Sequence, residues 1–95
     1  MKEKLKRTNF AKELREDIVG QKVNVAGWIE DIRDIGKIIF LVIRDITGPI
    51  QVIVDPEKFS QVRDIPRQSS IILSGTIQRS KAKEMKVELK LEEIG

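Results

Sequence analysis

Apolar and polar residues alternate with a period of two from residue 23 onward, and this alternation predicts β-strands. In the first strand Val23, Val25 and Ile29 share one face with Gly27. A glycine inside a strand indicates a bulge or a sharp bend at that point. The first strand therefore has one buried face and one place where it changes direction.

Four further stretches have strand character, and turn residues at 34–36 and 45–49 separate the first three strands. Gly75 again lies in the middle of one stretch, and the last stretch alternates strictly between apolar and charged residues. A small barrel bends its strands at such glycines. The expected strands cover residues 23–31, 37–44, 50–54, 70–79 and 85–91.

A short helix is expected between the third and fourth strands, at residues 55–64, with Asp55 as N-cap and Pro56 in the first turn. Three strands, a helix and two strands is the order of elements in an OB-fold. The sequence therefore predicts an all-β domain, a five-stranded OB-fold barrel over residues 23–95. An SH3-type barrel is the alternative, although it needs no helix at that position.

Residues 1–22 are predicted to form a basic N-terminal arm, loosely attached over residues 1–8, with a short helix at 9–17 capped by Asn9. The arm holds seven of the 18 Lys and Arg residues and four of the 15 Asp and Glu residues, so it carries the whole net charge of +3. A basic arm on a neutral body suits a polyanion partner. An ordinary solvated terminus is the other interpretation.

The composition argues against several classes of function. The chain has no Cys and no His, so it lacks a disulfide framework, a thiolate metal site and the commonest general base. We therefore expect no metal site, no cofactor and no stand-alone enzyme. No apolar run approaches the ~20 residues of a membrane-spanning helix, and no secretory signal is evident, so we expect a cytoplasmic protein without a membrane partner. Charged residues make up 35 % of the chain, a balance typical of thermophiles.

The second strand contains six consecutive apolar residues, 38–43, so alternation alone does not fix its buried face. If the odd-numbered residues fill the barrel, Phe40 lies outside, with Gln51 pointing outward on the adjacent strand. A flat ring stacks on a nucleotide base, a Gln amide matches a uracil edge, and Arg33 can contact a phosphate or a base. However, an aromatic residue in an apolar run is more often a core residue. The odd-numbered assignment predicts a core containing Val25, Ile39, Leu41, Val52, Leu73 and Leu89.

Residues 25–52, "VAGWIEDIRDIG…F…RDITGPIQV", resemble the N-terminal anticodon-binding domain of class II aspartyl-, asparaginyl- and lysyl-tRNA synthetases. The leader "LKRTNFAKEL" is similar to that of archaeal-type aspartyl-tRNA synthetases in particular. The resemblance covers nearly the whole chain. The positions that match at family spacing are Gly27-Trp28, Arg33-Asp34, Gly36, Phe40, Arg44-Asp45, Gly48 and Gln51.

The resemblance implies an anticodon stem-loop of tRNA as partner and roles for four residues. Phe40 would stack on the middle anticodon base, a uracil, and Gln51 would read the edge of that base. Arg33 would contact the anticodon, and Glu88 on the last strand would help to read a flanking base. The implied function is recognition of the anticodon by base stacking and edge hydrogen bonds.

Three departures from the family pattern stand beside the matches. Lys37 replaces a second turn glycine, Pro49 replaces an apolar residue, and residues 81–86 replace a Gly-containing stretch. The ATP- and amino-acid-binding motifs of the family's catalytic domain do not occur, so ligase activity would need a separate catalytic domain as partner. As an alternative function, the barrel, natural or engineered, would bind a protein partner through the same concave face. Outward residues such as Ile38 and Val42 would then contribute.

Overall fold

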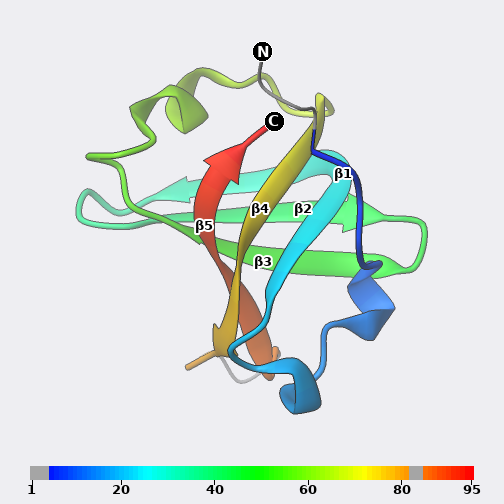
Figure 1. Ribbon diagram of the computed structural model, residues 1–95. Coiled ribbons are helices and arrows are strands. Elements are labelled where there is room, and N and C mark those ends of the chain that lie inside the picture. The colour runs from blue at the N-terminus through cyan, green and yellow to red at the C-terminus, as the bar shows by residue number, and fades with distance from the viewer. Residues whose placement is uncertain (1–4, 82–84) are drawn as a thin grey trace.

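Five strands close into a barrel in the computed structural model, which describes residues 5–81 and 85–95 (Figure 1). Around the barrel the strands follow the order β1-β2-β3-β5-β4, and β4 pairs with β1 to close it. This is the OB-fold arrangement, so the predicted fold class is confirmed. The strands are β1 (Lys22–Asp34), β2 (Ile39–Asp45), β3 (Gly48–Val54), β4 (Ser70–Arg79) and β5 (Val87–Ile94).

The seam between β3 and β5 is the shortest in the barrel. These two strands are parallel and pair, within the described residues, at Val52–Leu89 and Ile53–Lys90. The other neighbouring strands are antiparallel and pair over six or seven positions each. Few backbone hydrogen bonds therefore join β3 to β5, and side chains that bridge the two strands contribute more to holding them together.

The helical segments are shorter than the sequence predicted. The expected helix at 9–17 is replaced by two 3-10 turns, η1 (Ala11–Glu13) and η2 (Glu16–Ile18), and Phe10 rather than Asn9 precedes the first of them. Within the part of the chain that the structure describes, no helix is long and apolar enough to cross a membrane.

The helix predicted at 55–64 begins five residues later, as the 3-10 helix η3 (Ser60–Asp64). Asp55 caps a turn instead, because its side chain accepts a hydrogen bond from the backbone N–H of Glu57 at 3.0 Å. Phe59 then has φ −131° and ψ 51°, outside the helical region, which interrupts the helical path before η3. The half-buried Phe59 side chain packs against the core, and this packing wins over the local helix signal.

A bulge at Glu30 extends β1 beyond its predicted end at residue 31. Ile29 pairs with Ile43, but Asp31 pairs with Val42, so one extra residue lies between them on β1. Since one extra residue reverses the faces of a strand, even-numbered residues point inward after the bulge. Arg33 thereby comes to the outer surface.

The core confirms the odd-numbered assignment of β2. All six residues predicted to share one core have no exposed surface, and Ile43, Val54 and Val62 are equally buried. Phe40 lies outside this cluster and is only half-buried. The two mid-strand glycines lie where a neighbouring strand comes close, and the bulge of β1 lies at Glu30 rather than at Gly27. A Cβ on Gly27 would overlap the carbonyl oxygen of Arg44, and one on Gly75 would overlap that of Lys90.

The N-terminal arm is attached to the barrel over its described residues, so the expectation of a loose segment is wrong for residues 6–8. Thr8 and Asn9 donate backbone hydrogen bonds to the carbonyl oxygen of Asn24, and the Asn24 side chain donates to the carbonyl oxygen of Lys6. Residues 1–4 lie outside the described chain. Figure 1 shows the arm running along β1 before η1 and η2 cover one end of the barrel.

A buried carboxylate joins η1 to the turn between β2 and β3. Asp45 is 3 % exposed, and its side chain accepts hydrogen bonds from the backbone N–H groups of Ala11 and Thr47, both at 2.7 Å. The Thr47 hydroxyl donates a third bond at 2.6 Å. Burial by itself raises the pKa of Asp45, but these bonds and the backbone N–H of Gly48 outweigh it and bring the pKa below the ordinary 3.8.

Candidate nucleic-acid interface

The outer faces of the strands form a surface hollow of about 670 Å³ that collects all four sequence-predicted site residues. Arg33 comes from the end of β1, Phe40 from β2, Gln51 from β3 and Glu88 from β5. Four strands thus contribute one residue each to a single concave surface. The sequence placed these residues on separate strands, and barrel closure brings them together.

One row of outward side chains crosses this surface, and we call it the stacking row. Strand register places Arg33 opposite Phe40, Phe40 opposite Ile53 and Ile53 opposite Lys90. Neighbouring strands lie ~4.8 Å apart, so the row spans roughly 14 Å from the backbone of Arg33 to that of Lys90. An aromatic ring with an aliphatic neighbour is therefore bracketed by two positive charges.

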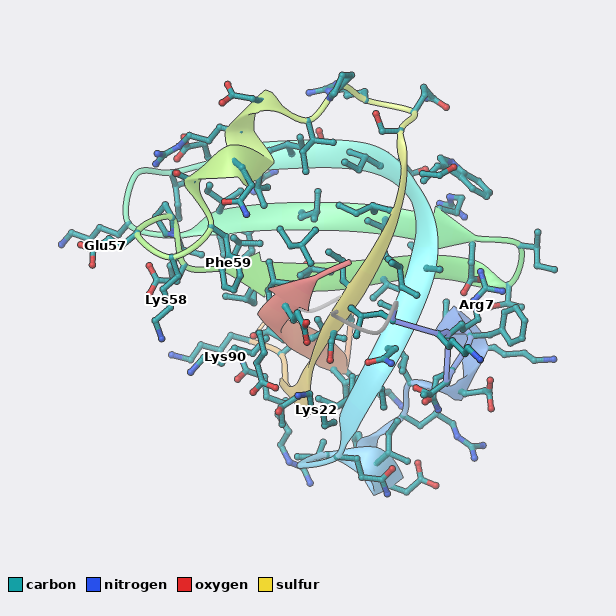
Figure 2. All side chains as sticks on the ribbon, turned by 45° about the horizontal axis from the view of Figure 1, so that its top comes forward. Arg7, Lys22, Glu57, Lys58, Phe59 and Lys90 are labelled. Carbon is teal, nitrogen blue, oxygen red and sulfur yellow. The ribbon has the colours of Figure 1, made fainter. Side chains whose placement is uncertain are left out.

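The stacking row continues toward a second hollow of about 540 Å³, which Ile53 also lines. Lys37, Lys58 and Lys90 all reach this second hollow. Figure 2 shows the side chains of Lys58 and Lys90 extending away from the barrel into solvent. Asp55 and Glu57 line the same hollow, so this end of the surface offers an anionic ligand three ammonium groups beside two carboxylates.

A second row of polar side chains lies beside the stacking row, and we call it the amide row. Gln78 pairs with Glu88 across β4 and β5, and Glu88 faces Gln51 across the seam between β5 and β3. The Nε2 group of Gln51 donates to Glu88 Oε1 at 3.0 Å, and that of Gln78 donates to Glu88 Oε2 at 2.6 Å. The Gln51 amide also approaches Ser80 Oγ at 3.4 Å. One carboxylate therefore holds two amides.

Arg33 is a guanidinium on this surface that has no ion pair among the described residues. Among the described residues, Asp31 pairs with Arg67 at 3.4 Å and Asp34 pairs with Arg63 at 2.6 Å, but no ion pair involves Arg33. The hydrogen bond from Arg63, together with one from the Gly36 backbone, holds the pKa of Asp34 below 3.8. Asp34 is thus already engaged in fixing the turn beside Arg33.

Another hollow, of about 650 Å³, lies on the other side of the Gln51–Glu88 pair. It runs between the N-terminal arm and β3 and β5, and Leu14, Pro49 and Lys86 contribute to its lining. Gln51 and Glu88 line both this hollow and the one that contains Phe40. A chain of nucleotides lying across the surface would meet the same polar pair from two adjacent sites.

Sequence reasoning did not identify Gln78, Lys90 or Ile53 as parts of this surface. Alternation in the third, fourth and fifth stretches gave their outward orientation, but not their neighbours. The neighbours depend on how β5 aligns with β3 and β4, and the β4–β5 pair contains a register shift between Ser74 and Gly75. The sequence indicates a bend at Gly75, but it does not give the register that the two strands adopt on either side of it. Among the described residues, no cluster of acidic side chains is suited to a metal ion.

Comparison with known proteins gives a consistent result. A family model for tRNA anticodon-binding segments, described as an OB-fold nucleic acid binding domain, matches residues 23–95. The chain is 39 % identical over 83 residues to the aspartate–tRNA(Asp/Asn) ligase of Methanosphaera stadtmanae, which covers 82 % of this chain and 19 % of that protein. It is 37 % identical over 95 residues to the corresponding ligase of Methanosarcina acetivorans, covering 93 % and 21 %. The chain thus spans about a fifth of these relatives.

Solved structures agree with this result. The asparaginyl-tRNA synthetase of Pyrococcus horikoshii superposes with a TM-score of 0.83 at 30 % identity, over 92 % of this chain and 22 % of that one. An OBody bound to hen egg-white lysozyme superposes with a TM-score of 0.88 at 22 % identity, over 98 % and 94 %. The likeness to the OBody shows the fold alone.

Proposed function

Because the chain belongs to the family of anticodon-binding OB-fold domains found in aspartyl- and asparaginyl-tRNA synthetases, we propose that it binds the anticodon loop of a tRNA for aspartate or asparagine. The family resemblance identified from the sequence is confirmed. The tRNA partner and the way the loop is recognised are the proposed part, and the surface described above supports both.

The observation that carries the proposal is the convergence of the four site residues on one hollow. The Phe40 ring is only partly buried and lines the hollow, where a base could stack on it, and stacking contributes about 1–3 kcal/mol per base. Gln51 lies next to it to contact the base edge. Arg33 at one end of the stacking row can bind a phosphate or a base, because no carboxylate among the described residues neutralises it.

We further propose that Glu88 contributes to a flanking base, as its position between two hollows suggests. In a longer protein the domain would hold the anticodon while a catalytic domain acts on the other end of the tRNA. The names of the relatives support a separate catalytic domain, since they are tRNA ligases of which this chain spans about a fifth. The likeness to the OBody, at 22 % identity, shows the fold alone and does not favour the protein-scaffold alternative.

The test compares Phe40→Ala with two matched apolar truncations. Affinity for an anticodon hairpin with uracil in the middle position is measured by fluorescence anisotropy, and stability by thermal melting. Phe40→Ala should weaken binding by about 1–3 kcal/mol while the melting temperature stays close to that of the unchanged protein. Ile46→Ala, at a side chain that is 87 % exposed away from the hollow, should change neither quantity.

Leu41→Ala provides the opposite control. Leu41 is fully buried one position along the same strand, and its truncation should cost about 2–5 kcal/mol of stability. If Phe40→Ala behaved like Leu41→Ala, or if it bound the hairpin as tightly as the unchanged protein, the proposed stacking role would be refuted.

A further inference from the structure

The amide of Gln51 has a fixed orientation, and Glu88 fixes it. An ionised carboxylate only accepts hydrogen bonds, so the group of Gln51 that lies 3.0 Å from Glu88 Oε1 has to be the nitrogen. The second approach of the same nitrogen, to Ser80 Oγ at 3.4 Å, uses its other hydrogen. Within residues 5–81 and 85–95 the Gln51 oxygen accepts no hydrogen bond, so this acceptor is left for a ligand.

Glu88 is itself held in place. Its second oxygen accepts the short bond of 2.6 Å from the Gln78 amide on the opposite neighbouring strand. The carboxylate therefore sits between amides of β3 and β4 and cannot rotate toward one without leaving the other. This arrangement is more than a surface contact, because all three side chains are half-buried.

Orientation matters because a free amide does not distinguish uracil from cytosine. Uracil presents an acceptor (O4) beside a donor (N3–H), and cytosine presents a donor (N4–H) beside an acceptor (N3). A half-turn of a Gln side chain exchanges its donor and acceptor in the same way. A Gln that turns freely fits both bases, so its specificity depends on what prevents the turn.

The register gives Gln51 the reach that this reading needs. Gln51 lies directly opposite Val42, two residues from Phe40 along β2. Such diagonal neighbours on one face of a sheet are roughly 7–8 Å apart, which is within reach of a long side chain. A base lying on the Phe40 ring therefore presents an edge to the Gln51 amide.

We propose, building on the anticodon-binding function above, that Glu88 is a positioning residue that locks the Gln51 amide with its oxygen toward the base. Gln78 holds Glu88 in that role. The locked oxygen accepts a hydrogen bond from a base that carries N–H at the facing position, as uracil does at N3. Cytosine places a lone pair there instead and leaves both acceptors unpaired, so the site prefers uracil.

The experiment measures dissociation constants for two anticodon hairpins that differ only in a middle uracil or cytosine. The unchanged chain should prefer the uracil hairpin by roughly tenfold or more. Glu88→Gln keeps the size of the side chain but gives residue 88 an amide that donates as well as accepts. Its preference should fall to near unity, while its affinity for the uracil hairpin falls much less. Gln78→Ala should reduce the preference partially.

Phe40→Ala separates failure of this proposal from failure of the proposed function. It should weaken both hairpins about equally and leave the preference unchanged. If the unchanged chain bound neither hairpin, the anticodon-binding function itself would be refuted, and if it bound them but Phe40→Ala had no effect, the stacking role of Phe40 would be refuted. If Phe40→Ala weakened binding but Glu88→Gln kept the full preference, only the locking role would be overturned. If Glu88→Gln lost affinity equally for both hairpins, the locking role would be overturned too.

A second measurement needs no variant, so it remains decisive even if Glu88→Gln fails to fold. The unchanged chain is tested with 3-methyluridine or 4-thiouridine in the middle position of the hairpin. The first lacks the N3–H group and should lose the preference over cytosine. The second keeps N3–H and should bind about as well as uridine. If 3-methyluridine kept the affinity of uridine and 4-thiouridine lost it, the site would read O4 rather than N3–H, and the locked-oxygen assignment would be wrong.

Discussion

Replacing Asp45 by Asn tests whether one buried carboxylate holds the N-terminal arm to the barrel. The two side chains have nearly the same shape, but the Asn amide has one oxygen where Asp has two. The Asn oxygen can keep the bonds from Thr47, and its NH₂ group then faces the N–H of Ala11, which now lies opposite another donor. The substitution thus removes one bond and weakens two.

The expected cost follows from these three bonds. A partly buried N–H left without an acceptor costs about 1–3 kcal/mol. The two bonds from Thr47 lose the assistance of the charge, which roughly halves the strength of each. We expect Asp45→Asn to lower the free energy of unfolding by about 2–4 kcal/mol. For a domain of this size, each kcal/mol lowers the melting temperature by roughly 4–8 °C.

The assay is urea unfolding at neutral pH, with Asp55→Asn as the matched control. Asp55 is exposed, and its side chain accepts one backbone bond two residues ahead, as Asp45 also does. The same substitution there should change stability by no more than about 0.5 kcal/mol. Equal effects of the two substitutions would refute the idea that the Asp45 carboxylate joins the arm to the barrel.

The acid dependence of stability provides an independent check on Asp45. Its folded-state pKa lies below the 3.8 of an unfolded carboxyl, so the unfolded state binds the proton more readily. The contribution of Asp45 is therefore complete above about pH 3.8 and is lost as the pH falls through the folded-state pKa. Asp45→Asn should remove this part of the acid dependence, and a variant that kept the full acid dependence would contradict the assignment.

Two further predictions concern the barrel and the arm. Gly75→Ala should lower the free energy of unfolding by several times the ~1 kcal/mol that an ordinary substitution costs, because a Cβ there overlaps the carbonyl oxygen of Lys90 in the neighbouring strand. A melting temperature within a few degrees of the unchanged chain would show that β5 can move aside. Deleting residues 1–7 should flatten the salt dependence of RNA affinity, since this segment carries Lys2, Lys4, Lys6 and Arg7; an unchanged slope of log Kd against log salt would mean that these cations do not contact phosphates.

The sequence was sufficient for the parts of the fold that alternation controls. In β2 the choice of the odd-numbered face predicted both the buried Leu41 and the outward Phe40, and the structure confirms both. The strand at 70–79 was predicted with its observed bounds. Both predictions succeed for the same reason: a strand with one buried face alternates apolar and polar residues, and this alternation is visible in the sequence.

The parts that the sequence did not predict depend on contacts between distant segments. No sequence pattern predicts the bulge at Glu30, since the residues after it are mostly charged and their pattern is that of a turn rather than a strand. The helix at 55–64 fails because packing of Phe59 against the core overrides the capping signals of Asp55 and Pro56. The bond from Gln78 to Glu88 depends on the β4–β5 register, which only the closed barrel determines.

The short seam between β3 and β5 gives this surface a dynamic property. Where few backbone bonds join two strands, local opening needs less free energy than global unfolding, and amide hydrogens there exchange sooner. The Gln51–Glu88 bond crosses that seam, so any ligand that contacts both side chains bridges β3 and β5. Ligand binding should therefore slow hydrogen–deuterium exchange in β5 around Leu89 more than in the long β1–β4 ladder. Slower exchange at the β3–β5 seam would then report that a ligand occupies the surface.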